Sequence, residues 1–127
     1  MVVLKISGSV VSEISVGYAV TLRFGTRPAR YELQVECPFY LADHWGVEMV
    51  RQKDYGNAES RLESLVGTVV VFAYADDSGE LAMRFDNGAT MSVPADRDFE
   101  AWGIAGPGGY RVISGPGGEL AFWSRRP

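Results

Sequence analysis

The sequence predicts a mainly β fold, an antiparallel sandwich or partly open barrel with one short helix. Apolar residues alternate with polar ones through several short segments, and glycine-rich turns separate these segments. One stretch has the periodicity of a helix. With 127 residues, 46% of them hydrophobic, the chain can build one core. We therefore expect residues 1–127 to form a single β domain of about eight or nine strands.

The part of the chain before residue 96 contains two similar units of three strands each. Three segments of the first unit have a counterpart in the second: GSVV at 8–11 and GTVV at 67–70, AVTLRF at 19–24 and ELAMRF at 80–85, YELQV at 31–35 and ATMSV at 89–93. Alternation within these segments predicts one buried and one wet face. We expect an internal repeat, residues 1–50 and 66–95, that forms a pair of packed sheets.

Between the units, residues 58–66 form the predicted helix. Asn57 can cap its start, Leu62, Leu65 and Val66 give it an apolar stripe, and Gly67 stops it. A helix this short needs tertiary packing. We expect it to cover one end or edge of the sheets.

The last part of the chain predicts a three-strand meander over residues 99–124, opened by Trp102 and closed by Trp123. The letters GPGG occur twice, at 106–109 and 115–118. Proline and glycine suit the second and third places of a type II turn, so each copy predicts a chain reversal. The strands are expected at residues 100–105, 110–114 and 119–123.

Composition and charge exclude several classes of function. The net charge of −4 makes nucleic acid a poor partner. The N-terminus lacks an export signal and no apolar run is long enough to span a membrane, so we expect a cytoplasmic protein. The single cysteine, Cys37, excludes an intrachain disulfide and suits a reducing compartment. It continues an alternating strand, which predicts a buried small hydrophobe rather than a reactive thiol.

No combination of residues predicts a catalytic, metal or cofactor site. His44 is the one histidine, and Asp43 and Glu48 do not form a known ligand spacing with it. Stacking near Trp45 or capping of backbone groups is expected instead. The GPGG turns lack the lysine and the following helix of a phosphate loop. We therefore expect no catalytic residue, no metal and no cofactor, and a protein that is not an enzyme.

Acidic residues are concentrated in residues 76–100, which hold seven carboxylates and two arginines. Asp96, Asp98, Glu100 and Trp102 stand at alternate positions, so an extended chain would place three carboxylates and an indole on one side. With Asp86 nearby, these residues are the predicted partner-binding site for a basic protein. Two alternatives remain open: solvated or edge-protecting charge, and glycoside chemistry between paired carboxylates.

The residues FEAW at 99–102, GPGG at 106–109 and GPGGELAFW at 115–123 resemble the C-terminal signature of a family of small uncharacterised actinobacterial proteins. The helix ending at Gly67, the hairpin over 81–88 and Val93-Pro94 are similar to the same family. The resemblance implies no chemistry for individual residues. Small acidic one-domain proteins of this type resemble immunity proteins of polymorphic toxin systems, which implies a protein that covers the active site of a toxin domain.

These observations lead to one expected function and two alternatives. We expect a non-enzymatic protein-binding module, immunity or antitoxin-like, that covers a basic surface of its partner. A small-ligand-binding β barrel would instead need an apolar cavity between the duplicated sheets. A structural homodimer would form through an unpaired edge strand.

Overall fold

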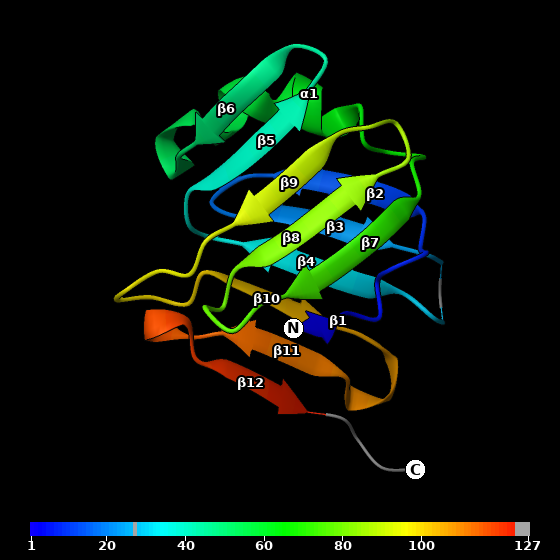
Figure 1. The fold of residues 1–127 in the computed structure, drawn as a ribbon. Helices are drawn as coiled ribbons and strands as arrows, with labels where there is room; N and C mark the ends of the chain where they lie inside the picture. The colour runs from blue at the N-terminus through cyan, green and yellow to red at the C-terminus, as the bar shows by residue number, and fades with distance from the viewer. Residues whose placement is uncertain (27, 124–127) are drawn as a thin grey trace.

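The computed structural model describes residues 1–26 and 28–123, which form twelve strands in two six-stranded antiparallel sheets (Figure 1). In chain order the strands are β1 (Val2–Val3), β2 (Val11–Val16), β3 (Val20–Phe24), β4 (Tyr31–Val35), β5 (Phe39–Asp43), β6 (Gly46–Val50), β7 (Val70–Ala75), β8 (Leu81–Phe85), β9 (Thr90–Val93), β10 (Trp102–Ala105), β11 (Arg111–Ser114) and β12 (Leu120–Trp123). The predicted mainly β sandwich is confirmed, and its sheets do not close into a barrel. The predicted number of strands is too low, because β1 and the β5–β6 hairpin were not among the predicted strands.

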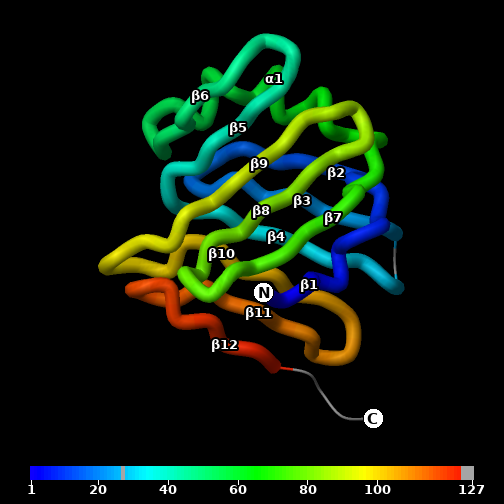
Figure 2. The backbone as a smooth tube through the Cα atoms, viewed as in Figure 1, coloured from blue at the N-terminus to red at the C-terminus, as the bar shows by residue number. Residues whose placement is uncertain are grey.

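The strands that follow each predicted three-strand unit join the sheet of the other unit. The first sheet has the order β1-β7-β8-β9-β5-β6 and the second the order β12-β11-β10-β4-β3-β2. Each three-strand unit is an antiparallel meander, and the chain then crosses to the other sheet. There, β5 pairs with β9 and β10 pairs with β4. Figure 2 shows both crossings at the same end of the sandwich.

Alternation along the strands builds the core between the sheets. Val20, Leu22 and Phe24 on β3 are fully buried, as are Leu81 and Phe85 on β8. Both meanders also carry a β-bulge at the same place in their first strand, between Val11 and Glu13 in β2 and between Val70 and Phe72 in β7. A bulge increases local twist, so both meanders bend in the same way.

The segments GSVV and GTVV, which match in sequence, lie against each other. The Gly8 N–H donates to the Val70 carbonyl at 2.7 Å, and the Val11 N–H donates to the Thr68 carbonyl at 2.8 Å. An isolated antiparallel bridge joins Val10 to Val69 between them. Backbone bonds of these segments therefore hold the first strands of the two meanders together.

The helical segment differs from its prediction. It begins as a 3₁₀ helix, Gln52–Ala58, and continues as α1 (Glu59–Glu63). Asn57 lies inside the 3₁₀ helix, and the residue before α1 is Ala58, whose methyl group cannot cap it, so the Asn57 cap is wrong. Leu62 and Leu65 are buried as expected, but Val66 is exposed. The segment covers the end of the sandwich beside β5 and β6 (Figure 1). None of the helices in the described part of the chain is long and apolar enough to cross a membrane.

The C-terminal meander is confirmed as β10, β11 and β12. Gly108 and Gly117 have φ values of 70° and 77°, as type II turns require at their third place. The second turn packs on the β7–β8 turn, where a Cβ atom on Gly118 would overlap the Ser78 carbonyl oxygen. Glycine is therefore needed at residue 118 for both its φ and its close approach.

Candidate functional site

The predicted site residue Trp102 does not lie on the surface. It is 1% exposed, on the inner side of β10, and its Nε1 donates to the Gly79 carbonyl at 3.0 Å. The Ser114 hydroxyl donates to the same carbonyl at 2.9 Å. The predicted pairing of an exposed Trp102 with the carboxylates is wrong, because this indole is part of the contact between the two sheets.

Asp86 is separated from the other predicted site residues. It follows β8, and its carboxylate accepts a hydrogen bond from the Val69 N–H at 3.1 Å. Asp96 follows β9, which runs antiparallel to β8. Asp86 therefore lies beyond the last residue of β8, and Asp96 lies beyond the end of β9 that pairs with the first residue of β8. Asp86 therefore supports the start of β7, and the expectation that it lies near the other carboxylates is wrong.

Asp96 folds the loop that joins β9 to β10. One of its carboxylate oxygens accepts the N–H groups of Asp98 at 2.9 Å and of Phe99 at 2.8 Å. Its own carbonyl accepts the Gly117 N–H at 2.8 Å. The loop is not extended, so side chains do not alternate along it. Asp98, Phe99 and Glu100 are all exposed.

Phe99 and Glu100 line a surface groove of about 480 Å³ together with residues from three other parts of the chain. Tyr18 comes from the β2–β3 turn, Glu36 and Cys37 from the crossing between β4 and β5, and Gln52 from the start of the 3₁₀ helix. Tyr18 is 78% exposed and Phe99 is 69% exposed. We call this site, formed by Tyr18, Glu36, Cys37, Gln52, Phe99 and Glu100, the acidic–aromatic groove.

Hydrogen bonds join the elements that form the acidic–aromatic groove. The Glu36 N–H donates to the Ala101 carbonyl at 3.2 Å, which ties the two sheet crossings together. The Tyr55 hydroxyl donates to the Cys37 carbonyl at 2.9 Å, and the Gln52 amide donates to the Tyr18 carbonyl at 2.9 Å. These bonds fix the backbone of the elements that carry the groove residues, which lowers the entropy cost of binding.

The electrostatic environment of the acidic–aromatic groove is negative. Burial first, and then the carboxylates of Asp96 and Glu36, raise the pKa of the Cys37 thiol to about 11. Residue Cys37 as a whole is 8% exposed, which confirms the predicted buried cysteine. Within residues 1–26 and 28–123, no basic side chain forms an ion pair with Glu36 or Glu100, whereas Glu13 and Glu32 both pair with Arg23. A guanidinium or ammonium group could bind between these carboxylates and the aromatic rings.

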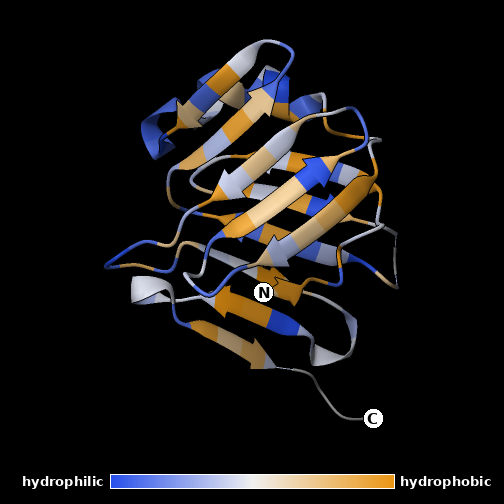
Figure 3. Ribbon diagram, viewed as in Figure 1, coloured by the Kyte–Doolittle hydropathy of each residue, from blue (hydrophilic) through white to orange (hydrophobic). Residues whose placement is uncertain are grey.

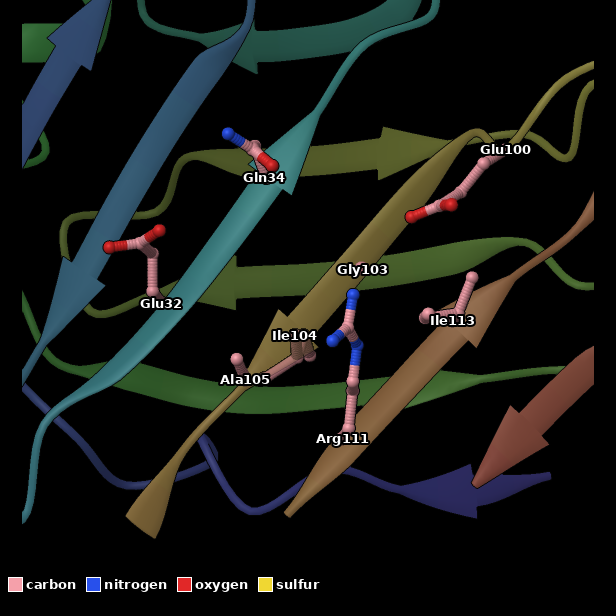
Figure 4. Close-up of a pocket in the computed structure, with 8 residues that line it drawn as sticks. All are labelled: Glu32, Gln34, Glu100, Gly103, Ile104, Ala105, Arg111 and Ile113. Atoms are coloured by element: carbon pink, nitrogen blue, oxygen red, sulfur yellow. The ribbon is translucent and has the colours of Figure 1, made fainter. Parts of the chain in front are cut away.

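Glu100 also faces a smaller hollow of about 60 Å³ on the outer face of the second sheet (Figure 4). Glu100 and Arg111 reach over Gly103 from opposite ends, and Glu32 and Gln34 lie on β4 beside it. A Cβ atom on Gly103 would lie 3.2 Å from Oε1 of Glu100, so the glycine leaves room for this carboxylate. Glu100 thus lines both hollows.

The remaining candidate side chains from the sequence analysis do not form a binding or catalytic site among the residues that the structure describes. His44 lies against Trp45, as expected, with ring centroids 3.7 Å apart and the ring planes tilted by 37°. In the described part of the chain, histidine, cysteine and carboxylate side chains do not gather into a group that could hold a metal ion. Sequence reasoning missed Tyr18, Glu36 and Phe99 as groove residues. Phe99 stood within the acidic segment, but nothing in the sequence linked Tyr18 or Glu36 to it.

The fold and the site define a small antiparallel β-sandwich protein with an acidic–aromatic groove at one end. A family model described as a family of unknown function (DUF6188) matches residues 2–124, so the chain belongs to this family. No curated protein and no solved structure shows significant similarity to the chain. The resemblance to an uncharacterised family is confirmed, and its implied immunity-like function remains a prediction.

Proposed function

We propose that the protein is a non-enzymatic protein-binding module whose acidic–aromatic groove receives a basic side chain of its partner. One observation carries the proposal: two exposed rings, Tyr18 and Phe99, line the same groove as the carboxylates of Glu36 and Glu100, and no basic side chain within residues 1–26 and 28–123 forms an ion pair with either carboxylate. Exposed aromatic side chains at the centre of a contact are typical binding hot spots.

The chemistry of the groove favours an arginine over a neutral group. A guanidinium can donate two parallel hydrogen bonds to a carboxylate while its plane stacks on an aromatic ring. Asp98, exposed next to Phe99 in the same loop, adds a long-range attraction that raises the rate of encounter. A toxin domain with a basic active site, acting in the cytoplasm, is the partner that the resemblance to immunity proteins implies.

The small-ligand alternative has weaker support. It requires an apolar cavity between the sheets, but the inward side chains Leu22, Leu33, Leu41 and Phe85 are fully buried against one another in one core. The acidic–aromatic groove lies outside that core, at the sheet crossings. Its carboxylates and exposed rings suit a charged group better than an apolar ligand.

A comparison of matched baits tests the proposed function. The native chain, the double variant Glu36→Gln and Glu100→Gln, and a control with Glu59→Gln and Glu63→Gln would each be used to capture proteins from the native lysate. The control removes the same charge from exposed sites on α1. The captured protein would then be titrated at about 50 and about 300 mM salt.

We expect one basic protein on the native and control baits. The groove variant should bind it at least about tenfold more weakly, with a flatter salt dependence, because two charge-assisted contacts are lost. Phe99→Ala should weaken binding without changing the salt dependence, because it removes contact area but no charge. Equal affinity for the native chain and the groove variant would contradict the proposal.

A further inference from the structure

The outer face of the first sheet carries very little charge. The strand register places six side chains in one row across this face: Val3, Tyr74, Ala82, Ser92, Tyr40 and Met49. The neighbouring row contains Phe72, Arg84 and Val47, with small residues between the last two. The first sheet lies in front of the second in Figure 3, so this outer face is turned toward the viewer. Most of these side chains are half-buried or exposed.

An apolar surface of this extent needs a reason. With strands about 4.8 Å apart and about five residues of 3.3 Å in each, the face covers roughly 450 Å². This area includes polar side chains such as Ser92 and Arg84, and it falls in the range of the largest patch on a typical single chain, which is often functional. The groove described above lies at the sheet crossings, so this face is not part of it.

Two opposite charges on β8 make this face complementary to itself. Arg84 is exposed near the end of β8, and Glu80 immediately precedes the strand. Side chains alternate along a strand, and Leu81, Met83 and Phe85 are buried on the inner face. Arg84 and Glu80 therefore belong to the outer face. They lie four residues apart, about 13 Å, and Ala82 is midway between them. Within the described residues, neither forms an ion pair with another side chain.

We propose that a second copy of this chain packs on the outer face of the first sheet. The two-fold axis lies between the two packed faces, parallel to the sheets and perpendicular to the strands, and it passes over Ala82 of β8. Arg84 of each copy then meets Glu80 of the other, and the row through Ala82 packs on itself. Small residues at the centre of the row, Ala82 and Ser92, let the sheets approach, while Tyr74 and Tyr40 supply contact area on either side.

The charges on this face favour a second copy of the chain over other binding partners. A second copy supplies both the apolar face and the two carboxylates that Arg84 and its symmetry mate require. The area limits the affinity: two faces bury about 900 Å² in total, at the small end of specific interfaces. A dimer that forms in the micromolar range is expected.

Sedimentation equilibrium of the full chain from about 5 to about 500 µM tests the proposal. We expect the apparent mass to rise from 13.9 kDa toward twice that value. Arg84→Glu and Glu80→Arg, although they change the net charge in opposite directions, should each weaken the dimer at least tenfold. The double variant should restore it, because the ion pairs form again with reversed sign. Arg111→Glu, on the outer face of the other sheet, is the control and should have no effect.

Two results would overturn the proposal. One is a mass of 13.9 kDa over the whole range. The other is a dimer that neither charge reversal weakens, which would assign self-association to another surface, such as an edge strand. Recovery in the double variant also excludes misfolding as the reason for a loss in the single variants.

Discussion

The contact between the β7–β8 turn and the second GPGG turn gives the sharpest test of the packing. Gly117 and Gly118 both have positive φ values, 77° and 88°. A Cβ atom on Gly117 would meet no heavy atom within 4 Å, whereas one on Gly118 would overlap the Ser78 carbonyl oxygen. Alanine at either residue therefore has the same backbone cost, and only Gly118→Ala adds a clash.

The difference between the two variants can be estimated from this geometry. Positive φ costs an alanine about 1–2 kcal/mol at either residue. The clash at Gly118 must also move the turn that carries Gly79, whose carbonyl accepts the buried hydrogen bonds of Trp102 and Ser114. Losing these bonds costs about 1 kcal/mol each. We expect losses of unfolding free energy of about 1–2 kcal/mol for Gly117→Ala and about 3–4 kcal/mol for Gly118→Ala.

Urea unfolding followed by tryptophan fluorescence measures this difference, because Trp102 lies in the affected contact. With a slope of about 1.5 kcal/mol per molar urea, the midpoint should fall by roughly 0.7–1.3 M in Gly117→Ala and by more than about 2 M in Gly118→Ala. Equal midpoints for the two variants would refute the close packing of the turns.

Two further predictions concern titratable groups. Arg61 donates to both carboxylate oxygens of Asp43 at 2.9 and 2.7 Å and to Glu48 at 2.9 Å. These bonds lower the pKa of Asp43, so stability is present above its unfolded pKa and is lost as the pH falls through the folded pKa. Arg61→Met should cost about 2–3 kcal/mol at pH 7, because it leaves a carboxylate that is 7% exposed without its cation. Melting temperatures of the variant should then fall less than those of the native chain from pH 5 to 3, and parallel curves would contradict this role. For Cys37, whose thiol is buried and has a pKa of about 11, alkylation by iodoacetamide at pH 8 should be at least a hundredfold slower in the folded chain than in urea. Equal rates would show that the thiol is accessible.

Local patterns predicted local structure well. Alternation in AVTLRF and ELAMRF predicted the buried faces of β3 and β8, and proline and glycine predicted both turns of the C-terminal meander. The helix was placed correctly but capped wrongly, because a 3₁₀ helix precedes α1 and takes Asn57 into its interior. Each success depended on residues close together in the sequence.

The same local reasoning failed for the predicted site because it assumed an extended chain. Asp96 accepts two backbone N–H groups of its own loop, so the alternation that would have placed Trp102 beside Glu100 is interrupted. The pairing of β10 with β4 then decides which side chains of β10 face the core, and Trp102 is one of them. Conversely, Phe99, which an extended chain would place on the side opposite to the carboxylates, is exposed next to Glu100.

Strand exchange explains why the candidate groove could not be predicted from the sequence. After each meander the chain crosses to the other sheet, once between β4 and β5 and once between β9 and β10. A backbone hydrogen bond from Glu36 to Ala101 joins these crossings, and the Cys37 thiol lies 3.6 Å from the Glu100 carbonyl. Residues more than 60 apart in the chain thus line one groove, on segments that carry no periodic pattern. The exchange of strands stabilises the sandwich and also creates the site, since a chain that kept each meander with its own following strands would not bring Glu36 to Glu100.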